Sequence, residues 1–553
     1  MRLRYFMHYS CVQPNFWGLT VRALQVARPL DCWKRCQQME WKMTRIPTKP
    51  ARQVSICSSV AAAIWTAAVG AGSADTLRIA VAADPGYLDP AYWGSSSEQL
   101  LIDNLYPRLA KYAAGDSWKA ELDAAQSVDL SDPQHISFEL KPGIMWSGGY
   151  GELTAEDVEY SFERHLDPDL ESGVSAEFSL LKDVEVTGKY TGIIHLSAPS
   201  PAFWSATLSY TSGAIISKAA AEASEGYFEA TPVATAGPYR FKSHEPGQPF
   251  MLEKDPDWSG AAAEFEEVAI IAIADDNAAR VAFDAGEIDY TYAASALEYD
   301  NWSKSSGNTE LRSSLDPLWM GISETYEGLS DIRVRQAIQK AVDVPTILAA
   351  ISNGRADHAT GIVAPGLLGY RDAAPKQRDL EGARALIAEA GAEGTVLRLD
   401  FVNTANRATI AQIVQANLAE IGLIVELNGQ DEGTFWSVDE ARAADLQLHV
   451  KSWTGNPDGI YTMQYFTSDQ VGVWNWEGLS NPDYDALVER ARRSTDDAER
   501  GRLYTQMQEM MEKSGNFLFL TNEPLTILWN DKIVPATLPD GRPVFAGFKK
   551  TAN

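Results

Sequence analysis

Cysteine is nearly absent from this sequence and is confined to one end: Cys11, Cys32, Cys36 and Cys57 all precede residue 58. Cys32 and Cys36 have a CxxxC spacing, but no second pair of ligands follows, which argues against a zinc site. The rest of the chain contains no cysteine. No disulfide framework therefore holds it, and cysteine usage indicates no particular redox compartment.

Positive charge is also scarce, with 47 Lys and Arg against 75 Asp and Glu and a net charge of −28. An acidic chain repels phosphate backbones, so nucleic-acid binding is excluded as a main function. The charge favours attraction of cationic ligands or partners, and adaptation to a salty medium explains it equally well. At 553 residues the chain is too long for one core, which predicts two or three domains.

The sequence also lacks the motifs of common catalytic and metal sites. It has no GxSxG nucleophile motif and no P-loop. His244 and Glu245 begin like a zinc-protease motif, but Gln248 occupies the second histidine position. After residue 74 no two histidines have the spacing of metal ligands. We therefore expect no catalytic residues, no metal and no cofactor.

Residues 43–74 have the pattern of a secretory signal peptide. Three basic residues precede a weakly hydrophobic run at 54–71, and 72–74 form a small-residue cleavage site. A membrane anchor is the alternative, because the run approaches spanning length. Since a signal peptide should start the chain, we expect translation to begin at Met43 and residues 1–42 to be a start-site artefact. The mature protein is then expected in the periplasm.

Hydrophobic periodicity predicts an α/β fold. Residues 396–402 read as a strand, 408–421 as an amphipathic helix and 423–427 as a second strand. A strand–helix–strand run is typical of a βαβ unit. Residues 331–344 predict another amphipathic helix, which Pro345 should end. No low-complexity linker separates the segments, which suggests domains joined by crossing strands.

Seven short motifs follow one another between residue 76 and about residue 490. In chain order they lie at 87–90 (YLDP), 104–106 (NLY), 140–158, 236–258, 285–289 (AGEID), 331–343 (DIRVRQAIQKAVD) and 480–485 (SNPDYD). Together, and in this order, they resemble the family-5 extracellular solute-binding proteins of ABC transporters, the dipeptide-, oligopeptide- and nickel-binding type. One motif alone would be a weak signal, whereas seven in register are a strong one.

The resemblance implies an α/β, two-lobe periplasmic-binding-protein fold, with an extra domain in the first lobe and with lobes joined by crossing strands. It implies a solute bound between the lobes, which close by hinge motion, and docking on an inner-membrane ABC permease with its ATPase. We expect a monomer without nucleic-acid partners. The expected limits are lobe I at 75–112, extra domain II at 113–232, lobe I again at 233–314, lobe III at 315–513 and lobe I again at 514–553.

In peptide-binding members of the family, a Trp-x-x-Asp motif places a carboxylate against the α-ammonium of the peptide. The matching stretch here reads Trp453-Thr454-Gly455-Asn456-Pro457-Asp458. Asn456 stands in place of the Asp, and a neutral amide binds a buried ammonium less strongly than a carboxylate. Asp458 supplies the charge if the loop turns differently. Alternatively, residues 456–459 are simply a turn.

An aromatic wall is expected beside this loop. Trp474 and Trp476 alternate as on a strand, so both rings should face one side. Such a wall stacks on side chains, sugars or cations, and ordinary core packing is the alternative. The remaining aromatic candidates for the cleft are Trp436, Tyr92, Trp93 and Trp319. His449 lies near in sequence but matches no nickel-ligand pattern.

These observations leave four hypotheses open. The first is a periplasmic peptide-binding protein. The second is the same scaffold binding an oligosaccharide, an opine-like conjugate or a cationic amine, which the aromatic wall and Asn456 favour. A secreted hydrolase and a holdase-like periplasmic protein are the third and fourth, and the sequence gives the hydrolase little support.

Overall fold

The structure of the protein is a computed structural model that describes residues 75–293, 295–438, 442–443 and 445–552. The expected signal peptide at 43–74 and the segment 1–42 lie outside the described residues. Within the described part, no helix combines the length and the apolar character needed to cross a membrane.

A ten-stranded mixed sheet forms the centre of the described chain. In the order of hydrogen-bonded neighbours its strands are β14 (Ile424–Gln430), β13 (Val396–Val402), β15 (Leu448–Ser452), β12 (Asn308–Ile322), β16 (Phe517–Trp529), β11 (Tyr290–Ala293), β1 (Thr76–Val81), β10 (Glu267–Ala272), β9 (Phe250–Lys254) and β8 (Tyr239–Ser243). Neighbours in the sheet are therefore often distant in the sequence.

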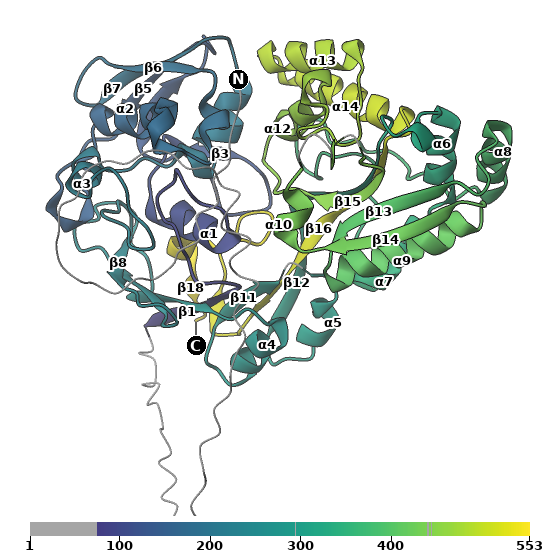
Figure 1. Ribbon diagram of the computed structural model, residues 1–553. Coiled ribbons are helices and arrows are strands. Elements are labelled where there is room, and N and C mark those ends of the chain that lie inside the picture. The colour runs from purple at the N-terminus through teal and green to yellow at the C-terminus, as the bar shows by residue number, and fades with distance from the viewer. Residues whose placement is uncertain (1–74, 294, 439–441, 444, 553) are drawn as a thin grey trace, which may run out of the picture. The chain divides into compact units, whose positions relative to one another are not determined.

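Two long strands, β12 and β16, carry this sheet from one lobe to the other (Figure 1). They pair antiparallel from Asn308↔Trp529 to Gly321↔Phe517, with a break in register between Ser313 and Pro317. The strands from β11 to β8 belong to lobe I, and β15, β13 and β14 belong to lobe III. The sheet thus has the crossing strands that the resemblance implies.

The predicted βαβ unit is present in lobe III. β13 and β14 pair in parallel from Val396↔Ile424 onward, and α9 (Ala405–Ala419) connects them. The helix buries Ile410, Val414 and Leu418 completely against the lobe III core. Because an apolar stripe is stable only when it packs on the sheet, the periodicity predicted this helix; the expected bounds were 408–421 and the observed bounds are Ala405–Ala419.

The extra domain has its own four-stranded sheet and its own core. The sheet has the order β4 (Ala125–Asp129), β5 (His135–Leu140), β7 (Thr191–Leu196) and β6 (Leu181–Val186). Its hydrophobic core draws on residues between Leu109 and Ala236. At the start of α2 (Ala155–Glu163), Asp157 Oδ2 accepts the backbone N–H of Thr154 at 2.8 Å. The exact domain limits remain predictions.

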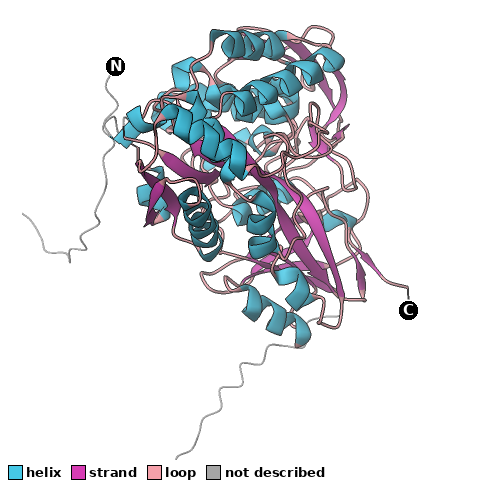
Figure 2. Ribbon diagram, turned by 90° about the vertical axis from the view of Figure 1, so that its right-hand side faces the viewer, coloured by secondary structure: helices cyan, strands magenta, loops and turns pink. Residues whose placement is uncertain are grey.

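The other elements are short strands and helices around these sheets. The strands are β2 (Ala110–Tyr112), β3 (Ala120–Leu122), β17 (Ile533–Val534) and β18 (Lys549–Lys550). The helices are α1 (Ser96–Leu105), α3 (Lys218–Ala223), α4 (Asp276–Asp284), α5 (Glu298–Trp302), α6 (Ile332–Ala341), α7 (Val344–Ser352), α8 (Leu380–Ala390), α10 (Glu432–Trp436), α12 (Gly459–Met463), α13 (Pro482–Arg493) and α14 (Asp497–Lys513). Figure 2 shows the long strands running between groups of helices.

The helix predicted at 331–344 is shorter than expected. It ends at Ala341, and Pro345 lies in the first turn of α7, where Asp343 caps the helix by accepting the backbone N–H of Thr346 at 3.1 Å. Proline suits a first turn because its missing N–H would have no partner there.

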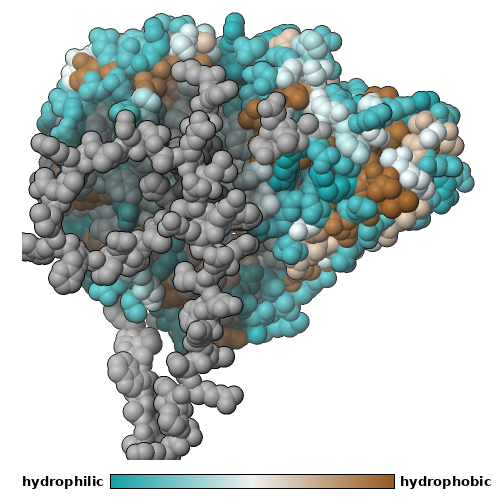
Figure 3. All heavy atoms as spheres, viewed as in Figure 1, coloured by the Kyte–Doolittle hydropathy of each residue, from teal (hydrophilic) through white to brown (hydrophobic). Residues whose placement is uncertain are grey.

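Hydrophilic residues prevail on the face of the molecule seen in Figure 3, in keeping with the net charge of −28.

Candidate functional site

The 453–458 loop follows β15 and ends where α12 begins. Its path depends on Gly455, because a Cβ atom at that position would lie 2.0 Å from the carbonyl oxygen of Leu315 on β12. The backbone N–H of Gly455 donates to Asp316 Oδ1 at 2.6 Å. At the other end, Asp458 accepts the backbone N–H of Ile460 at 3.2 Å and so caps α12. The loop is fixed at both ends to lobe III.

Hydrogen bonds from this loop and from α12 cross to the extra domain. They are Asn456 Nδ2 to the carbonyl oxygen of Ala206 (2.9 Å), Ser205 Oγ to Asp458 Oδ2 (2.7 Å), Tyr210 Oη to the carbonyl oxygen of Gly455 (3.5 Å) and Tyr461 Oη to Glu177 Oε1 (3.1 Å). The extra-domain partners come from the turn at Ser175–Phe178 and from the segment 203–210. The two sides of the molecule therefore meet at this loop.

The carboxylate of Asp458 is fully engaged by the protein itself. It forms an ion pair with Arg500, accepts the hydroxyl of Tyr504 at 2.7 Å, and also accepts Ser205 and the N–H of Ile460. A carboxylate offers about four lone-pair positions, and these four donors use them. The arrangement gives Asp458 a positioning role in the loop, and contact between Asp458 and a ligand stays a prediction.

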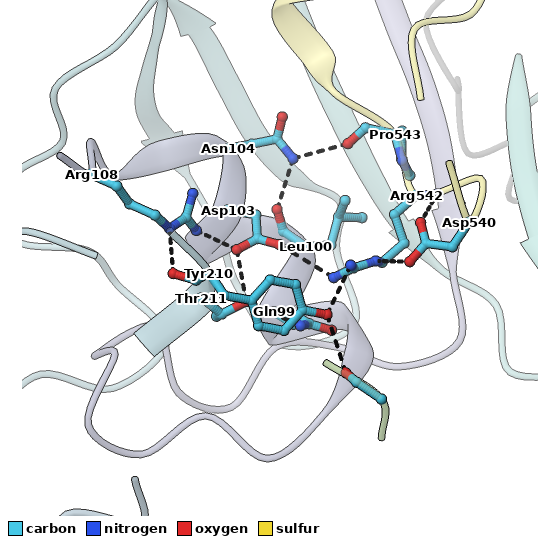
Figure 4. A network of polar contacts seen from close by, with 11 residues as sticks. Gln99, Leu100, Asp103, Asn104, Arg108, Tyr210, Thr211, Asp540, Arg542 and Pro543 are labelled. Atoms are coloured by element: carbon cyan, nitrogen blue, oxygen red, sulfur yellow. Dashed lines mark hydrogen bonds and ion pairs between the residues drawn. The ribbon is translucent and has the colours of Figure 1, made fainter. Parts of the chain in front are cut away.

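The Tyr210 side chain that contacts Gly455 is part of a larger polar network, which Figure 4 shows. Asp103 on α1 lies between Arg108 and Arg542 and forms an ion pair with each. Arg542 Nη2 donates to Tyr210 Oη at 2.9 Å, and Tyr210 Oη in turn donates to the carbonyl of Gly455. The network joins α1 and the C-terminal segment to the lobe III loop.

The predicted aromatic wall encloses a cation of the protein itself. The Nζ atom of Lys451 on β15 lies 4.4 Å from the ring centre of Trp476, 4.9 Å from that of Trp453 and 5.4 Å from that of Trp319. Lys451 is 1% exposed, Trp476 2% and Trp319 0%. Cation–π attraction is strongest at such desolvated positions. Trp319 and Trp476 are therefore core residues that hold a lysine.

Glu477 is the counter-ion of this buried lysine. Its Oε1 atom accepts the indole N–H of Trp319 at 2.7 Å and lies 2.9 Å from His449 Nε2 and 3.6 Å from Lys451 Nζ. Burial opposes ionisation of Glu477, but the positive charge of Lys451 and the contacts with His449 hold its pKa at about 2. Burial lowers the pKa of Lys451 to about 8 in spite of Glu477. The buried imidazole of His449 is thus held in the core by its contact with Glu477.

The expectation for Trp474 and Trp476 is wrong, because residues 471–478 form turns rather than a strand. The two rings consequently differ: Trp476 is buried, whereas Trp474 is 45% exposed. The Trp474 ring lies 6.3 Å from that of Trp453 and 5.8 Å from that of Tyr465. Trp436 is partly buried and packs 5.4 Å from Trp476. Thr454 is exposed beside this group.

Tyr92 and Trp93 make their contacts elsewhere. The hydroxyl of Tyr92 donates to the carbonyl oxygen of Leu170 at 2.6 Å, and its ring lies 5.5 Å from that of Tyr227. Trp93 packs between the cores of lobe I and of the extra domain. The structure therefore does not bring these two residues to the 453–458 loop.

Sequence reasoning missed a cavity between the extra domain and lobe III. Glu177, Phe203 and Ala206 line it from the extra domain, and Tyr461 and Tyr465 line it from lobe III. Burial raises the pKa of Glu177 to about 7, against hydrogen bonds from Ser212 and Tyr461 that lower it. Glu177 lies in a short 3-10 helix, Ser175–Phe178, and belongs to no recognised motif, so nothing in the sequence could have singled it out.

Metal-binding geometry is not found among these side chains. In the described part of the chain, no group of three or more His, Cys, Asp and Glu residues is arranged to hold a metal ion.

Comparison with known proteins places this arrangement in a family. The model of the bacterial extracellular solute-binding proteins, family 5 Middle, matches residues 118–473, which is more than half of the chain. The chain belongs to the bacterial extracellular solute-binding proteins of family 5. Relatives carry names of periplasmic peptide-binding proteins: the probable D,D-dipeptide-binding periplasmic protein DdpA of Escherichia coli K12 is 27% identical over 479 residues, covering 83% of this chain and 90% of the relative.

Solved structures share the two-lobe fold. HbpA2 from Haemophilus parasuis superimposes with a TM-score of 0.77 at 23% identity, covering 86% of this chain and 100% of that chain. The periplasmic binding protein DppA from Helicobacter pylori, solved in complex with the peptide STSA, gives a TM-score of 0.72 at 22% identity, covering 86% of this chain and 98% of that one. The expected fold class is confirmed.

Proposed function

We propose that this chain is the solute-capturing component of an ABC importer, which holds a peptide or a similar small solute between its lobes and delivers it to an inner-membrane permease with its ATPase. The observation that carries the proposal is the meeting of the extra domain and lobe III at the 453–458 loop, beside a cavity lined from both sides. Membership in family 5 and the peptide-binding names of its relatives support it.

The proposal includes export of the chain to the periplasm, with cleavage near Ala74, and action as a monomer. The signal-peptide pattern and the extracellular family support the location. A binding role needs no catalytic residue, and we propose none.

A second candidate is the same scaffold holding an oligosaccharide, an opine-like conjugate or a cationic amine. Asn456 favours it, because its amide donates to the carbonyl of Ala206 and provides no charge for a peptide amino terminus. Trp453 and the half-exposed Trp474 provide stacking surface for such ligands.

The test is thermal unfolding of the purified protein with dipeptides, oligopeptides, sugars and amines in turn. A ligand that binds only the folded protein raises its stability by about 2.7 kcal/mol at a hundred times its Kd. We expect a saturable shift with one of these classes. A rise with peptides supports the first candidate, and a rise with sugars or amines alone supports the second. If no class of solute raises the melting temperature, the capture function is wrong.

A further inference from the structure

We propose that Glu177 receives a cationic nitrogen of the captured solute, so that the solute binds through an ammonium group placed in the cavity beside Glu177 and Tyr461. The amino terminus of a peptide and a primary amine both provide such a group. This inference deepens the function proposed above and rests on it.

The first argument is which carboxylates beside the loop remain available. Asp458 is used by Arg500 and three further donors, and Glu477 by Lys451 and its neighbours. Asp316 accepts the N–H of Gly455 and is not among the residues that line the cavity; burial raises its pKa to about 6, against that hydrogen bond and the positive charge of Arg542. Glu177, in contrast, has no ion-pair partner among the described residues and accepts only hydroxyl groups, which leaves its charge uncompensated.

The second argument is where the Glu177 carboxylate lies. It lines the cavity between the extra domain and lobe III, which has a volume of about 60 Å³. That volume holds an ammonium with its first carbon atoms and not a whole dipeptide. A cation bound there would touch both sides of the molecule at once, because Glu177 belongs to the extra domain and Tyr461 to α12 of lobe III. Binding of the cation would thereby favour the closed state, in which the extra domain and lobe III are in contact.

The third argument is the surface that continues from this cavity. The Tyr461 ring lies 5.9 Å from Tyr465, and Tyr465 lies 5.5 Å from Trp453 and 5.8 Å from Trp474. The indole nitrogen of Trp453 is buried and has no acceptor among the described residues. Aromatic faces attract cations and apolar groups, and an unsatisfied N–H donor attracts a carbonyl oxygen. The surface therefore fits a solute with an ammonium at one end and a carbonyl group farther along.

The protonation of Glu177 gives the inference a second readout. Its pKa of about 7 means that the carboxyl is neutral in half of the molecules at that pH, and binding of an ammonium must ionise it. The groups facing Glu177 are Ser212, the phenols of Tyr461 and Tyr465, and Arg492 on α13, which pairs with Glu489 at 3.4 Å. Burial raises the pKa of both phenols, Tyr461 and Tyr465, above the ordinary tyrosine value, so neither titrates in the range of Glu177. Affinity for a cation should therefore fall about tenfold for each pH unit below 7.

The experiment compares alanyl-leucine with N-acetyl-alanyl-leucine, and 2-phenylethylamine with 2-phenylethanol, by calorimetric titration and thermal shift. The variant is Glu177→Gln, whose amide oxygen still accepts the hydroxyl of Tyr461. The control is Glu156→Gln, which removes one exposed charge on α2. We expect wild type to bind a free amine at least about 30-fold more tightly than its neutral counterpart, and we expect Glu177→Gln to lose that preference and the pH dependence while keeping its unliganded melting temperature.

Two results would overturn the inference. One is equal affinity of wild type and Glu177→Gln for the bound amine. The other is a bound solute that carries no cationic nitrogen. Either leaves the capture function standing, because a solute still binds. If no solute in the wider panel binds wild type, the capture function fails and the inference fails with it.

Discussion

The ammonium nitrogen of Lys451 lies 3.6 Å from the carboxylate of Glu477, and both side chains are completely excluded from solvent. The indole of Trp319 donates to the same carboxylate oxygen, and three tryptophan rings surround the lysine. The desolvation of two charges is costly, and only close geometry with further hydrogen bonds offsets it. The pair therefore fixes how β12, β15 and the 471–478 turn pack together.

Lys451→Met should lower the free energy of unfolding by about 3 kcal/mol, because it leaves the charge of Glu477 buried without its cation. Urea unfolding followed by tryptophan fluorescence measures the change. Lys513→Met is the matched control: its side chain is 72% exposed and pairs with Glu509 on the surface, so its effect should stay below about 1 kcal/mol. Equal midpoints for both variants would contradict the structural role of the buried pair.

Asp458→Asn should destabilise the unliganded protein by about 3 kcal/mol, since the buried Arg500 would keep only the exposed Asp497 as a counter-ion. The measurement is the thermal midpoint before any ligand is added. Glu177→Gln serves for comparison, because Glu177 has no cationic partner among the described residues and its loss should leave the midpoint unchanged or slightly higher. A wild-type midpoint for Asp458→Asn would mean that the carboxylate is free to serve a ligand.

The elements of this fold were largely predictable from the sequence, and the site was not. The strand predicted at 396–402 is β13, because an alternating apolar pattern is local and its burial follows from the pattern itself. The hydrogen bond between Tyr461 and Glu177, in contrast, joins residues 284 positions apart. No local pattern carries that proximity, which arises only when the extra domain meets lobe III.

The tryptophans show the same limit. The sequence places several aromatic residues near Trp453, but the alternation of Trp474 and Trp476 was misleading, because turns within 472–477 replace the expected strand and only Trp476 is buried. The partner of the cluster is Lys451, two residues before Trp453. Because lysines are usually exposed, the sequence does not predict that Lys451 is buried. Its burial follows from the presence of Glu477 beside it, which also contacts His449.

Gly455→Ala should prevent the loop from following its present path. The added Cβ atom would meet the backbone carbonyl of Leu315 at 2.0 Å, and backbone on a crossing strand cannot move aside as a flexible side chain can. We expect a loss of about 3 kcal/mol in unfolding free energy, together with weakened solute binding. Gly237→Ala is the control, because no atom lies within 4 Å of its added Cβ. Similar behaviour of the two variants in urea unfolding would contradict the close approach.

The pH dependence of stability should contain a contribution from His165. Its ring stacks on Phe178 at 4.2 Å, its Nδ1 lies 2.8 Å from Ser172 Oγ, and burial together with the charge of Arg164 lowers its pKa to about 3. The unfolded chain binds a proton at this histidine below about pH 6.5, whereas the folded protein does not until about pH 3. The stabilisation is therefore complete above pH 6.5 and is lost as the pH falls.

Between pH 6.5 and pH 4.5, His165 should account for about 2 kcal/mol of lost stability. Urea midpoints of wild type and His165→Asn at both pH values test this, since the variant removes the titrating ring and should show a correspondingly smaller loss on acidification. Ser172→Ala keeps the ring and removes only its hydrogen bond, so it should lower stability alike at both pH values. Parallel profiles of His165→Asn and wild type would show that the acid sensitivity arises at other groups.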